Sequence, residues 1–192
     1  QTIGKFFVKP TWADAAPSGD QIFLEIDPKM AFGTGYHATT RLVLNQLGDH
    51  TVRGKEVLDA GTGSGILAIA AAKLGATRVL GFDIDPWSRD NAVENIYLND
   101  VAGTVEFRFG GMEVVDDHEK FDLILANINR NVILELLPSF AEHARDGASI
   151  LLTGLLHTDE QVLRDHLENL PLTVEMLTRE DEWICFRLLK RF

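Results

Sequence analysis

A glycine-rich loop with an acid before it is the part of the sequence best suited to bind a ligand. Residues 57–67 read VLDAGTGSGIL, in which Asp59 precedes the alternating glycines Gly61, Gly63 and Gly65. Glycines let a ligand lie against bare backbone at the carboxyl end of a strand. A pyrophosphate-binding loop uses G-x-G-x-x-G spacing, and a buried acid beside it would repel the phosphates. The G-x-G-x-G spacing and the acid therefore favour a ligand that carries an ammonium and a sulfonium.

A second acid follows at the end of the next predicted strand. Asp83 and its neighbour Ile84 lie about 20 residues beyond the loop, where a carboxylate can accept both ribose hydroxyls of an adenosine. Asp85 precedes Pro86 and is expected to cap the following helix. A structural turn with a chance acid downstream is the alternative reading. The register of strand, loop, helix and second acid disfavours it.

These residues need a sheet to position them, and the chain from residue 54 onward alternates between strand and helix patterns. Predicted strands are the β-branched or apolar runs at residues 56–59, 78–83, 104–109, 121–126 and 148–153. Predicted helices are residues 66–74, 86–99, 130–145 and 158–170. Gly75 and Gly147 are expected just after helix ends. Strict alternation predicts a parallel sheet with helices on both faces.

The last segment breaks this alternation. Residues 172–178 and 183–189 read as consecutive strands joined by a charged turn, and such strands pair antiparallel. The prediction is an α/β fold with a mostly parallel seven-stranded sheet that ends in an antiparallel hairpin. This order differs from the all-parallel sheet of dinucleotide dehydrogenases, and it resembles the Rossmann-like fold of class I methyltransferases.

Length and composition are those of one globular domain. The chain has 192 residues, of which 45% are hydrophobic and 24% charged. Residues 1–20 are assigned to a linker segment and residues 21–192 to the domain. The longest apolar run, residues 66–72, is far shorter than the roughly 20 residues of a membrane-spanning helix. We therefore expect a soluble, cytoplasmic protein without a membrane partner.

Net charge and the use of histidine and cysteine limit the kinds of partner and metal site that the chain can have. A net charge of −11 without any run of Lys or Arg argues against direct nucleic-acid binding and favours a basic partner. Histidines are scattered without metal-ligand spacing, so no metal site is expected. Cys185, the single cysteine, lies in an apolar run and is expected to be a buried, unreactive thiol.

The stretch at residues 30–40, MAFGTGYHATT, matches no general strand or helix pattern. Its two glycines indicate a tight loop, and Thr39 or Thr40 is expected to cap the next helix. Together with DAGTGSG at residues 59–65, DIDP at 83–86 and ANI at 126–128, this string resembles the ribosomal protein L11 methyltransferase family, also called PrmA. The resemblance runs from about residue 10 to the C-terminus.

The resemblance implies S-adenosyl-L-methionine as cofactor and a set of residues around it. The implied cofactor contacts include Thr40, Gly61, Asp83 and Asn127, and the implied methyl-proximal wall is Phe32, Gly33, Thr34 and His37. Asn127 takes the first place of the [Asn/Asp]-Pro-Pro-aromatic motif of nitrogen methyltransferases, with both prolines absent. We nominate Asn127, Thr34 and His37 to position the acceptor amine. Two alternatives stay open: Asn127 as a turn residue, and His37 as either a general base or a loop-packing residue.

The function implied by the resemblance is methylation of lysine side chains and the α-amino terminus of a large-subunit ribosomal protein. Family members carry an N-terminal substrate-recognition domain that has no counterpart here, so this chain is expected to hold cofactor but to dock its ribosomal substrate poorly. The alternatives are a small-molecule or RNA methyltransferase, an NAD-dependent oxidoreductase and a non-catalytic cofactor-binding module. The glycine spacing and the terminal hairpin disfavour the oxidoreductase.

Overall fold

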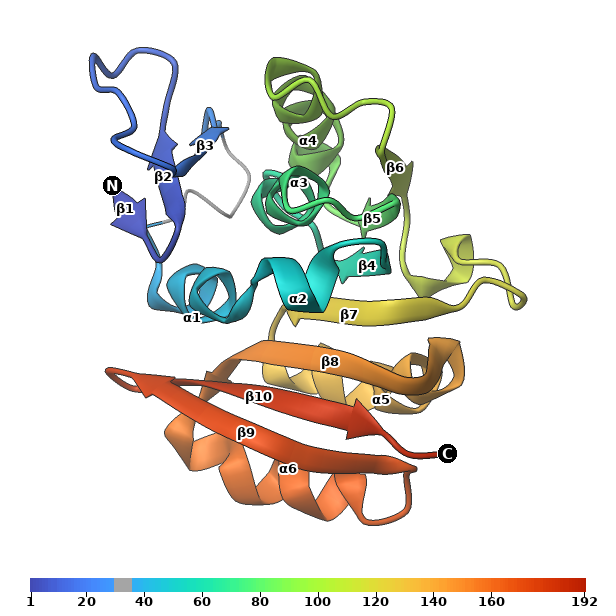
Figure 1. Ribbon diagram of the computed structural model, residues 1–192. Coiled ribbons are helices and arrows are strands. Elements are labelled where there is room, and N and C mark those ends of the chain that lie inside the picture. The colour runs from blue at the N-terminus through green and yellow to red at the C-terminus, as the bar shows by residue number, and fades with distance from the viewer. Residues whose placement is uncertain (30–35) are drawn as a thin grey trace.

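The computed structural model describes residues 1–29 and 36–192, over which seven strands form one sheet (Figure 1). The strands are β4 (Glu56–Ala60), β5 (Arg78–Asp83), β6 (Val105–Phe109), β7 (Phe121–Asn127), β8 (Ala144–Leu156), β9 (Leu172–Glu180) and β10 (Trp183–Lys190). Their order in the sheet is β6-β5-β4-β7-β8-β10-β9. The first five are parallel, and β10 pairs antiparallel with both β8 and β9. The predicted fold and its terminal hairpin are confirmed.

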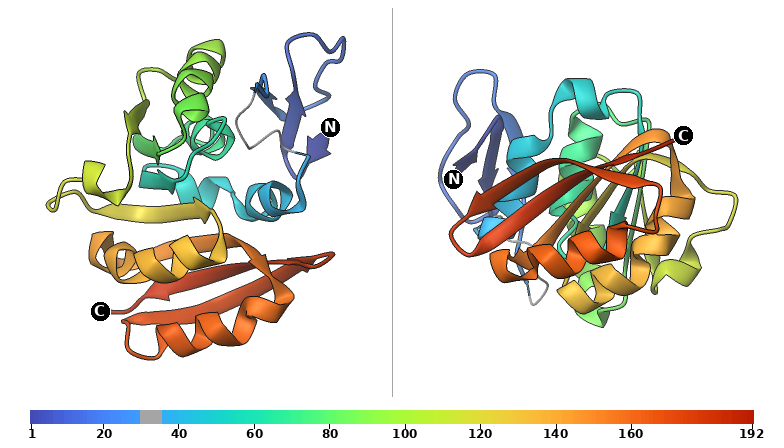
Figure 2. Two further views of the ribbon diagram at one scale, coloured as in Figure 1. Left: turned by 180° about the vertical axis from the view of Figure 1, so that it is seen from behind. Right: turned by 90° about the horizontal axis from the view of Figure 1, so that it is seen from below.

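Helices cover both faces of this sheet (Figure 2). They are α1 (Ala38–Gln46), α2 (Asp49–Val52), α3 (Ile66–Lys73), α4 (Pro86–Leu98), α5 (Arg130–His143) and α6 (Glu160–Leu167), with single 3₁₀ turns η1 (Met112–Val114) and η2 (His157–Asp159). Buried side chains of α1, α3 and α4 share one hydrophobic cluster, and those of α5 and α6 share the other. The sheet therefore has a core on each side, as parallel strands require.

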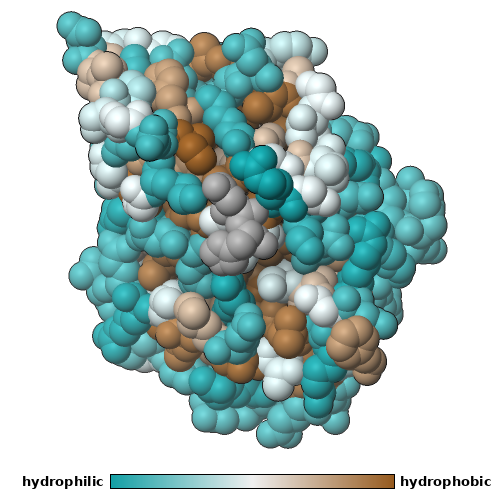
Figure 3. Space-filling view, viewed as in Figure 1, coloured by the Kyte–Doolittle hydropathy of each residue, from teal (hydrophilic) through white to brown (hydrophobic). Residues whose placement is uncertain are grey.

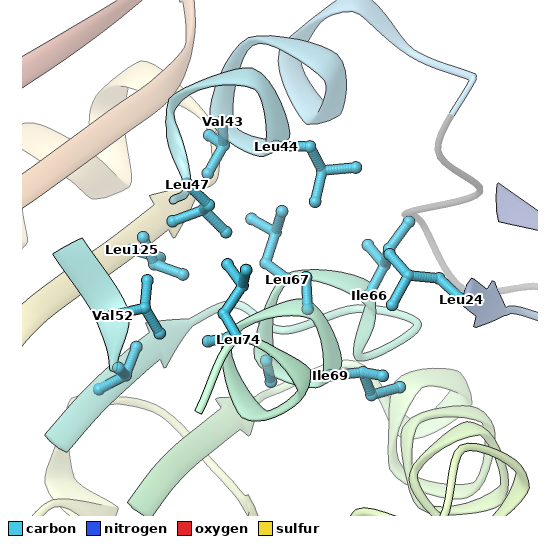
Figure 4. Close-up of a cluster of buried hydrophobic side chains, with 14 of the residues drawn as sticks. Leu24, Val43, Leu44, Leu47, Val52, Ile66, Leu67, Ile69, Leu74 and Leu125 are labelled. Carbon is cyan, nitrogen blue, oxygen red and sulfur yellow. The ribbon is translucent and has the colours of Figure 1, made fainter. Parts of the chain in front are cut away.

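Strand alternation divides the apolar residues between these two cores. Val57 of β4 faces the first cluster, whereas its neighbour Leu58 faces the second. Figure 4 shows the first core, where Leu44 of α1, Leu47 just after α1 and Leu67 of α3 gather in one cluster. Cys185 is fully buried, and burial raises the pKa of its thiol to about 12.

Most of the visible molecular surface is polar. Hydrophilic side chains cover most of the face in Figure 3, and hydrophobic ones form small separate groups. None of the helices in the described part of the chain has the length and apolar character needed to cross a membrane.

A small second sheet has two strands in the segment assigned to the linker and a third just after it. Strands β1 (Thr2–Ile3) and β2 (Phe6–Lys9) pair antiparallel, and β3 (Ile22–Glu25) joins β2 in parallel. Phe6 and Val8 are buried, because the two-residue period of β2 turns both toward the core beside α1 and α3 (Figure 1). Residues 2–3 and 6–9 thus form strands that the sequence analysis did not predict, and the division of the chain at residue 20 stays a prediction.

Three predicted details of the helices also need correction. His37, not Thr39 or Thr40, caps α1, because its Nδ1 accepts the Thr39 N–H at 3.3 Å. Gly147 lies within β8, which starts directly after α5 and shifts its register against β7. The helix predicted at residues 158–170 is shorter at both ends, since η2 occupies its first turn and α6 ends at Leu167. Asp85 does cap α4, accepting the Trp87 N–H at 3.0 Å.

An ion network joins β5, β6 and the segment before β7. Glu119 accepts hydrogen bonds from Arg78 at 2.5 Å and from Arg108 at 2.8 Å, and its side chain is only 8% exposed. The Arg108 hydrogen bond, joined by those from Asp116 and Arg78, lowers the pKa of Glu119 to about 2. The stabilisation that this carboxylate contributes is therefore present above its ordinary pKa of 4.5 and is lost as pH falls toward 2.

We expect Glu119→Gln to lower the free energy of unfolding at pH 7 by about 2 kcal/mol, because it leaves two arginines without their shared carboxylate. The variant should also lose less stability than the wild type between pH 5 and 3. Urea unfolding across this pH range measures both effects, with Glu168→Gln at an exposed position as the control. Parallel pH profiles for the wild type and Glu119→Gln would contradict the assignment.

Candidate functional site

A cavity of about 730 Å³ opens at the carboxyl ends of the central strands. Six residues nominated from the sequence line it: His37, Gly61, Gly63, Asp83, Ile84 and Asn127. Five of them end or follow β5, β4 and β7, whose parallel order brings them to one edge of the sheet, and His37 comes from the start of α1. Phe32, Gly33 and Thr34 lie outside the residues that the structure describes.

The glycine loop between β4 and α3 is held in a conformation that side chains resist. Gly61, Gly63 and Gly65 have φ values of +72°, +56° and +87°. A Cβ on Gly61 would lie 2.3 Å from the Ile128 Cγ2 atom. Glycine is therefore required at Gly61 both for its dihedral angle and for the close approach of the neighbouring loop.

Asp83 ties this loop to the end of β5. One carboxylate oxygen accepts the Gly63 N–H at 2.8 Å, and the other accepts the Asp85 N–H at 2.9 Å. A carboxylate has about four acceptor positions, so each oxygen keeps capacity for a further donor. Because Asp83 also lines the cavity, it can bind a pair of ligand hydroxyls while it holds the loop.

Asp59 lies beneath the loop, with no exposed surface. Its Oδ2 accepts the Thr62 hydroxyl at 2.7 Å, and Oδ1 has no hydrogen-bond partner among the described residues. Burial raises the pKa of this carboxyl to about 7, although the Thr62 hydrogen bond opposes the shift. A cation bound above the loop would favour the ionised form, because opposite charges attract strongly where water is excluded.

The opposite side of the cavity holds Asn127 and His37. Asn127 ends β7, and its Nδ2 donates to the hydroxyl of the fully buried Thr40 at 3.4 Å. His37 caps α1, and its ring meets Trp183 edge-on with 4.9 Å between centroids. Thr40 thus supports Asn127 from behind the cavity wall, and the hairpin strand β10 supports His37.

Sequence reasoning missed several lining residues. They include Met112, Glu113, Ile128, Glu135, Gly154 and Trp183. Gly154 had a local signal, because a glycine in a strand pattern marks a close backbone approach. It has φ +91°, and a Cβ there would lie 2.0 Å from the Ile128 carbonyl oxygen. Trp183 had no such signal, since only the pairing of β10 with β8 brings it to the cavity.

The cavity is acidic. Its lining includes the carboxylates of Asp83, Asp85, Glu113 and Glu135, and no Lys or Arg occurs among the described lining residues. Such a wall attracts cations and repels phosphates. No group of three or more His, Cys, Asp or Glu side chains suited to a metal ion occurs within residues 1–29 and 36–192.

Replacing Gly61 by Ala should destabilise the fold more than the same change at Gly54. Both glycines have nearly equal positive φ values, +72° and +74°, but a Cβ at Gly54 would meet nothing within 4 Å. Gly54→Ala should therefore lose about 1 kcal/mol from backbone strain alone. Gly61→Ala should lose about 2 kcal/mol more, because Ile128 must move. Urea unfolding measures the difference, and equal losses would refute the close approach.

Comparisons with known proteins agree with this architecture. The family model described as "Ribosomal protein L11 methyltransferase (PrmA)" matches residues 1–191. A ribosomal protein L11 methyltransferase from Chlorobaculum parvum is 48% identical over 168 residues, which cover 86% of this chain and 58% of that protein. One from Porphyromonas gingivalis is 42% identical, covering 89% of this chain and 59% of that protein. The chain thus spans less than two thirds of these relatives.

Solved structures give the same result at the level of the fold. A crystal structure of a ribosomal protein L11 methylase from Lactobacillus delbrueckii subsp. bulgaricus superimposes with a TM-score of 0.82 at 33% identity, covering 96% of this chain and 94% of that one. An RNA methyltransferase from Salinibacter ruber, solved with S-adenosyl-L-homocysteine, shares the fold at a TM-score of 0.62 and 20% identity over 78% of this chain and 90% of that one. From the family match and the 33% identical structure together, the chain belongs to the ribosomal protein L11 methyltransferase family.

Proposed function

We propose that this chain binds S-adenosyl-L-methionine at the glycine loop and directs methyl transfer to amines of a large-subunit ribosomal protein. The observation that carries the proposal is the Asp83 carboxylate, which accepts the Gly63 N–H and also lines the cavity. One group thereby holds the loop and offers acceptors for a ribose.

The residues present fit this cofactor. Gly61 and Gly63 line the cavity, so a ligand there can lie against the backbone of the loop, and the buried Asp59 beneath the loop has an unpaired carboxylate oxygen. When bound, the cofactor supplies a methyl group activated by a positively charged sulfur. Acidic lining residues favour that charge, and they disfavour the pyrophosphate that an NAD-dependent oxidoreductase would bind.

The acceptor side of the cavity suits an uncharged amine. A lysine amine has an ordinary pKa near 10.4, so it must lose a proton before its lone pair can attack. Partial burial between Asn127, His37 and Trp183 lowers that pKa by desolvation. The Asn127 amide orients the nitrogen, and alignment rather than a dedicated base contributes most of the rate. His37 acts mainly through packing, since it caps α1 and contacts Trp183.

A protein substrate is favoured over RNA. RNA methyltransferases occur among proteins of similar fold, such as the one from Salinibacter ruber, but at 20% identity this likeness extends to the fold alone. The net charge of −11 and the acidic cavity suit a basic protein. The family's own description names ribosomal protein L11, which is why we assign a ribosomal protein as the substrate and the cytoplasm as the location.

Isothermal titration should detect binding of S-adenosylhomocysteine and none of NADH. Asp83→Asn should weaken binding at least tenfold, because it removes the ionised acceptor for the ribose, a loss of about 1.4 kcal/mol or more. Asp90→Asn on the exposed side of α4 makes the same change in net charge and should bind like the wild type. NADH binding, or equal affinities for both variants, would contradict the cofactor assignment.

Mass spectrometry of ribosomal protein L11 after incubation with cofactor tests the substrate, and it should find methyl groups on lysine and N-terminal amines. The enzyme used should have the full length of the relatives, since this chain spans 58% of the Chlorobaculum protein. Asn127→Ala should lower kcat at least about tenfold through lost alignment, whereas Asn131→Ala on exposed α5 surface should not. Methylated RNA with unmodified protein would overturn the proposal.

A further inference from the structure

The buried face of α4 is polar where an apolar one is usual. Asn91, Asn95 and Asn99 recur every four residues, so they lie on one face of the helix, and they are 0%, 1% and 6% exposed. We call these three residues the asparagine ladder. Sequence reasoning did not single them out, although buried amides at helical spacing must find hydrogen-bond partners.

The asparagine ladder binds the backbone at the end of β3. Asn99 accepts the Glu25 N–H at 3.0 Å and donates to the Glu25 carbonyl at 2.7 Å. Asn95 accepts the Asp27 N–H at 3.0 Å, and Asn91 donates to the Asp27 carbonyl at 2.7 Å. Alternate residues of an extended chain present their backbone groups to the same side, so the ladder pairs with residues 25 and 27 as a neighbouring strand would.

Asn95 makes one contact that the other two do not. Its Nδ2 donates to the Ser64 carbonyl of the glycine loop at 2.9 Å, and both groups are buried. Ser64 directly follows Gly63, whose N–H binds Asp83. Asn95 therefore binds the residue next to Gly63, and the hydrogen bond from Gly63 to Asp83 is the one on which the proposed cofactor site rests.

The glycine loop needs such an external contact. Gly61, Gly63 and Gly65 all have positive φ, and glycine backbones lose more conformational entropy on ordering than other residues do. A buried carbonyl also requires a donor, and Ser64 receives one from Asn95. Without it, the Ser64–Gly65 peptide would be free to reorient. The Gly65 N–H of that peptide donates to the Thr62 carbonyl at 2.8 Å, and this carbonyl shares its peptide with the Gly63 N–H, so the change would reach the Gly63 N–H.

We propose that Asn95 is a positioning residue for the cofactor site, acting through Ser64 to keep the Gly63 N–H directed at Asp83. Asn99 has a different role, because it fixes Glu25 without touching the loop. The inference rests on the proposed function for its effect on affinity, whereas its effect on the loop itself does not depend on any ligand.

Two measurements on Asn95→Ala and the matched control Asn99→Ala test this role. Each variant loses a buried amide and a backbone contact from the same helix face. Titration with S-adenosylhomocysteine should give a Kd raised about tenfold for Asn95→Ala and about twofold or less for Asn99→Ala. Hydrogen–deuterium exchange without ligand should be faster over residues 61–65 in Asn95→Ala alone.

Asn95→Asp provides a second variant with the original side-chain shape, for use if the alanine variant fails to fold. It retains an acceptor for the Asp27 N–H but has no donor for Ser64, so it should match Asn95→Ala in both measurements. Equal Kd increases for the Asn95 and Asn99 variants, or unchanged exchange over residues 61–65, would overturn the positioning role. Failure of the wild type to bind the ligand would instead refute the proposed function, with the exchange result still deciding the role of Asn95.

Discussion

The hydrogen bond between the Gly63 N–H and the Asp83 carboxylate is the contact on which the rest of the site depends. It joins the loop after β4 to the end of β5, so two neighbouring strands fix one ligand-binding surface. The loop reaches that position only because Gly61 has φ +72° and leaves room for Ile128. The two hydrophobic cores on either side of the sheet hold these strand ends in register. The shape of the cavity therefore depends on side chains that pack away from it.

Charge gives this surface its chemical preference. Asp59 is buried under the loop, and burial raises the pKa of its carboxyl to about 7, so a cation bound above the loop would favour its ionised form. Four carboxylates line the cavity, and the described lining has no Lys or Arg to offset them. The cationic cofactor and the basic protein substrate that we propose both suit such a wall.

The antiparallel hairpin adds one wall of the cavity. Pairing of β10 with β8 carries Trp183 to His37, and Gly154 lets β8 pass against Ile128. Ile128 therefore contacts both the glycine loop and β8, and it joins the loop side of the cavity to the hairpin side. The asparagine ladder extends this coupling to the small N-terminal sheet, because Asn95 holds Asp27 and Ser64 together.

The sequence by itself determined the element order, the mostly parallel sheet with its hairpin, and the identity of the loop glycines and Asp83. These follow from short-range periodicity and from backbone angles that only certain residues tolerate. Tertiary structure decided the residues that act across long separations. Trp183, Glu135 and Asn95 reach the site or its loop only through strand order and helix packing. The strands at residues 2–9 and the His37 cap were likewise missed, because a short strand and a helix end are stabilised by distant partners that local patterns do not specify.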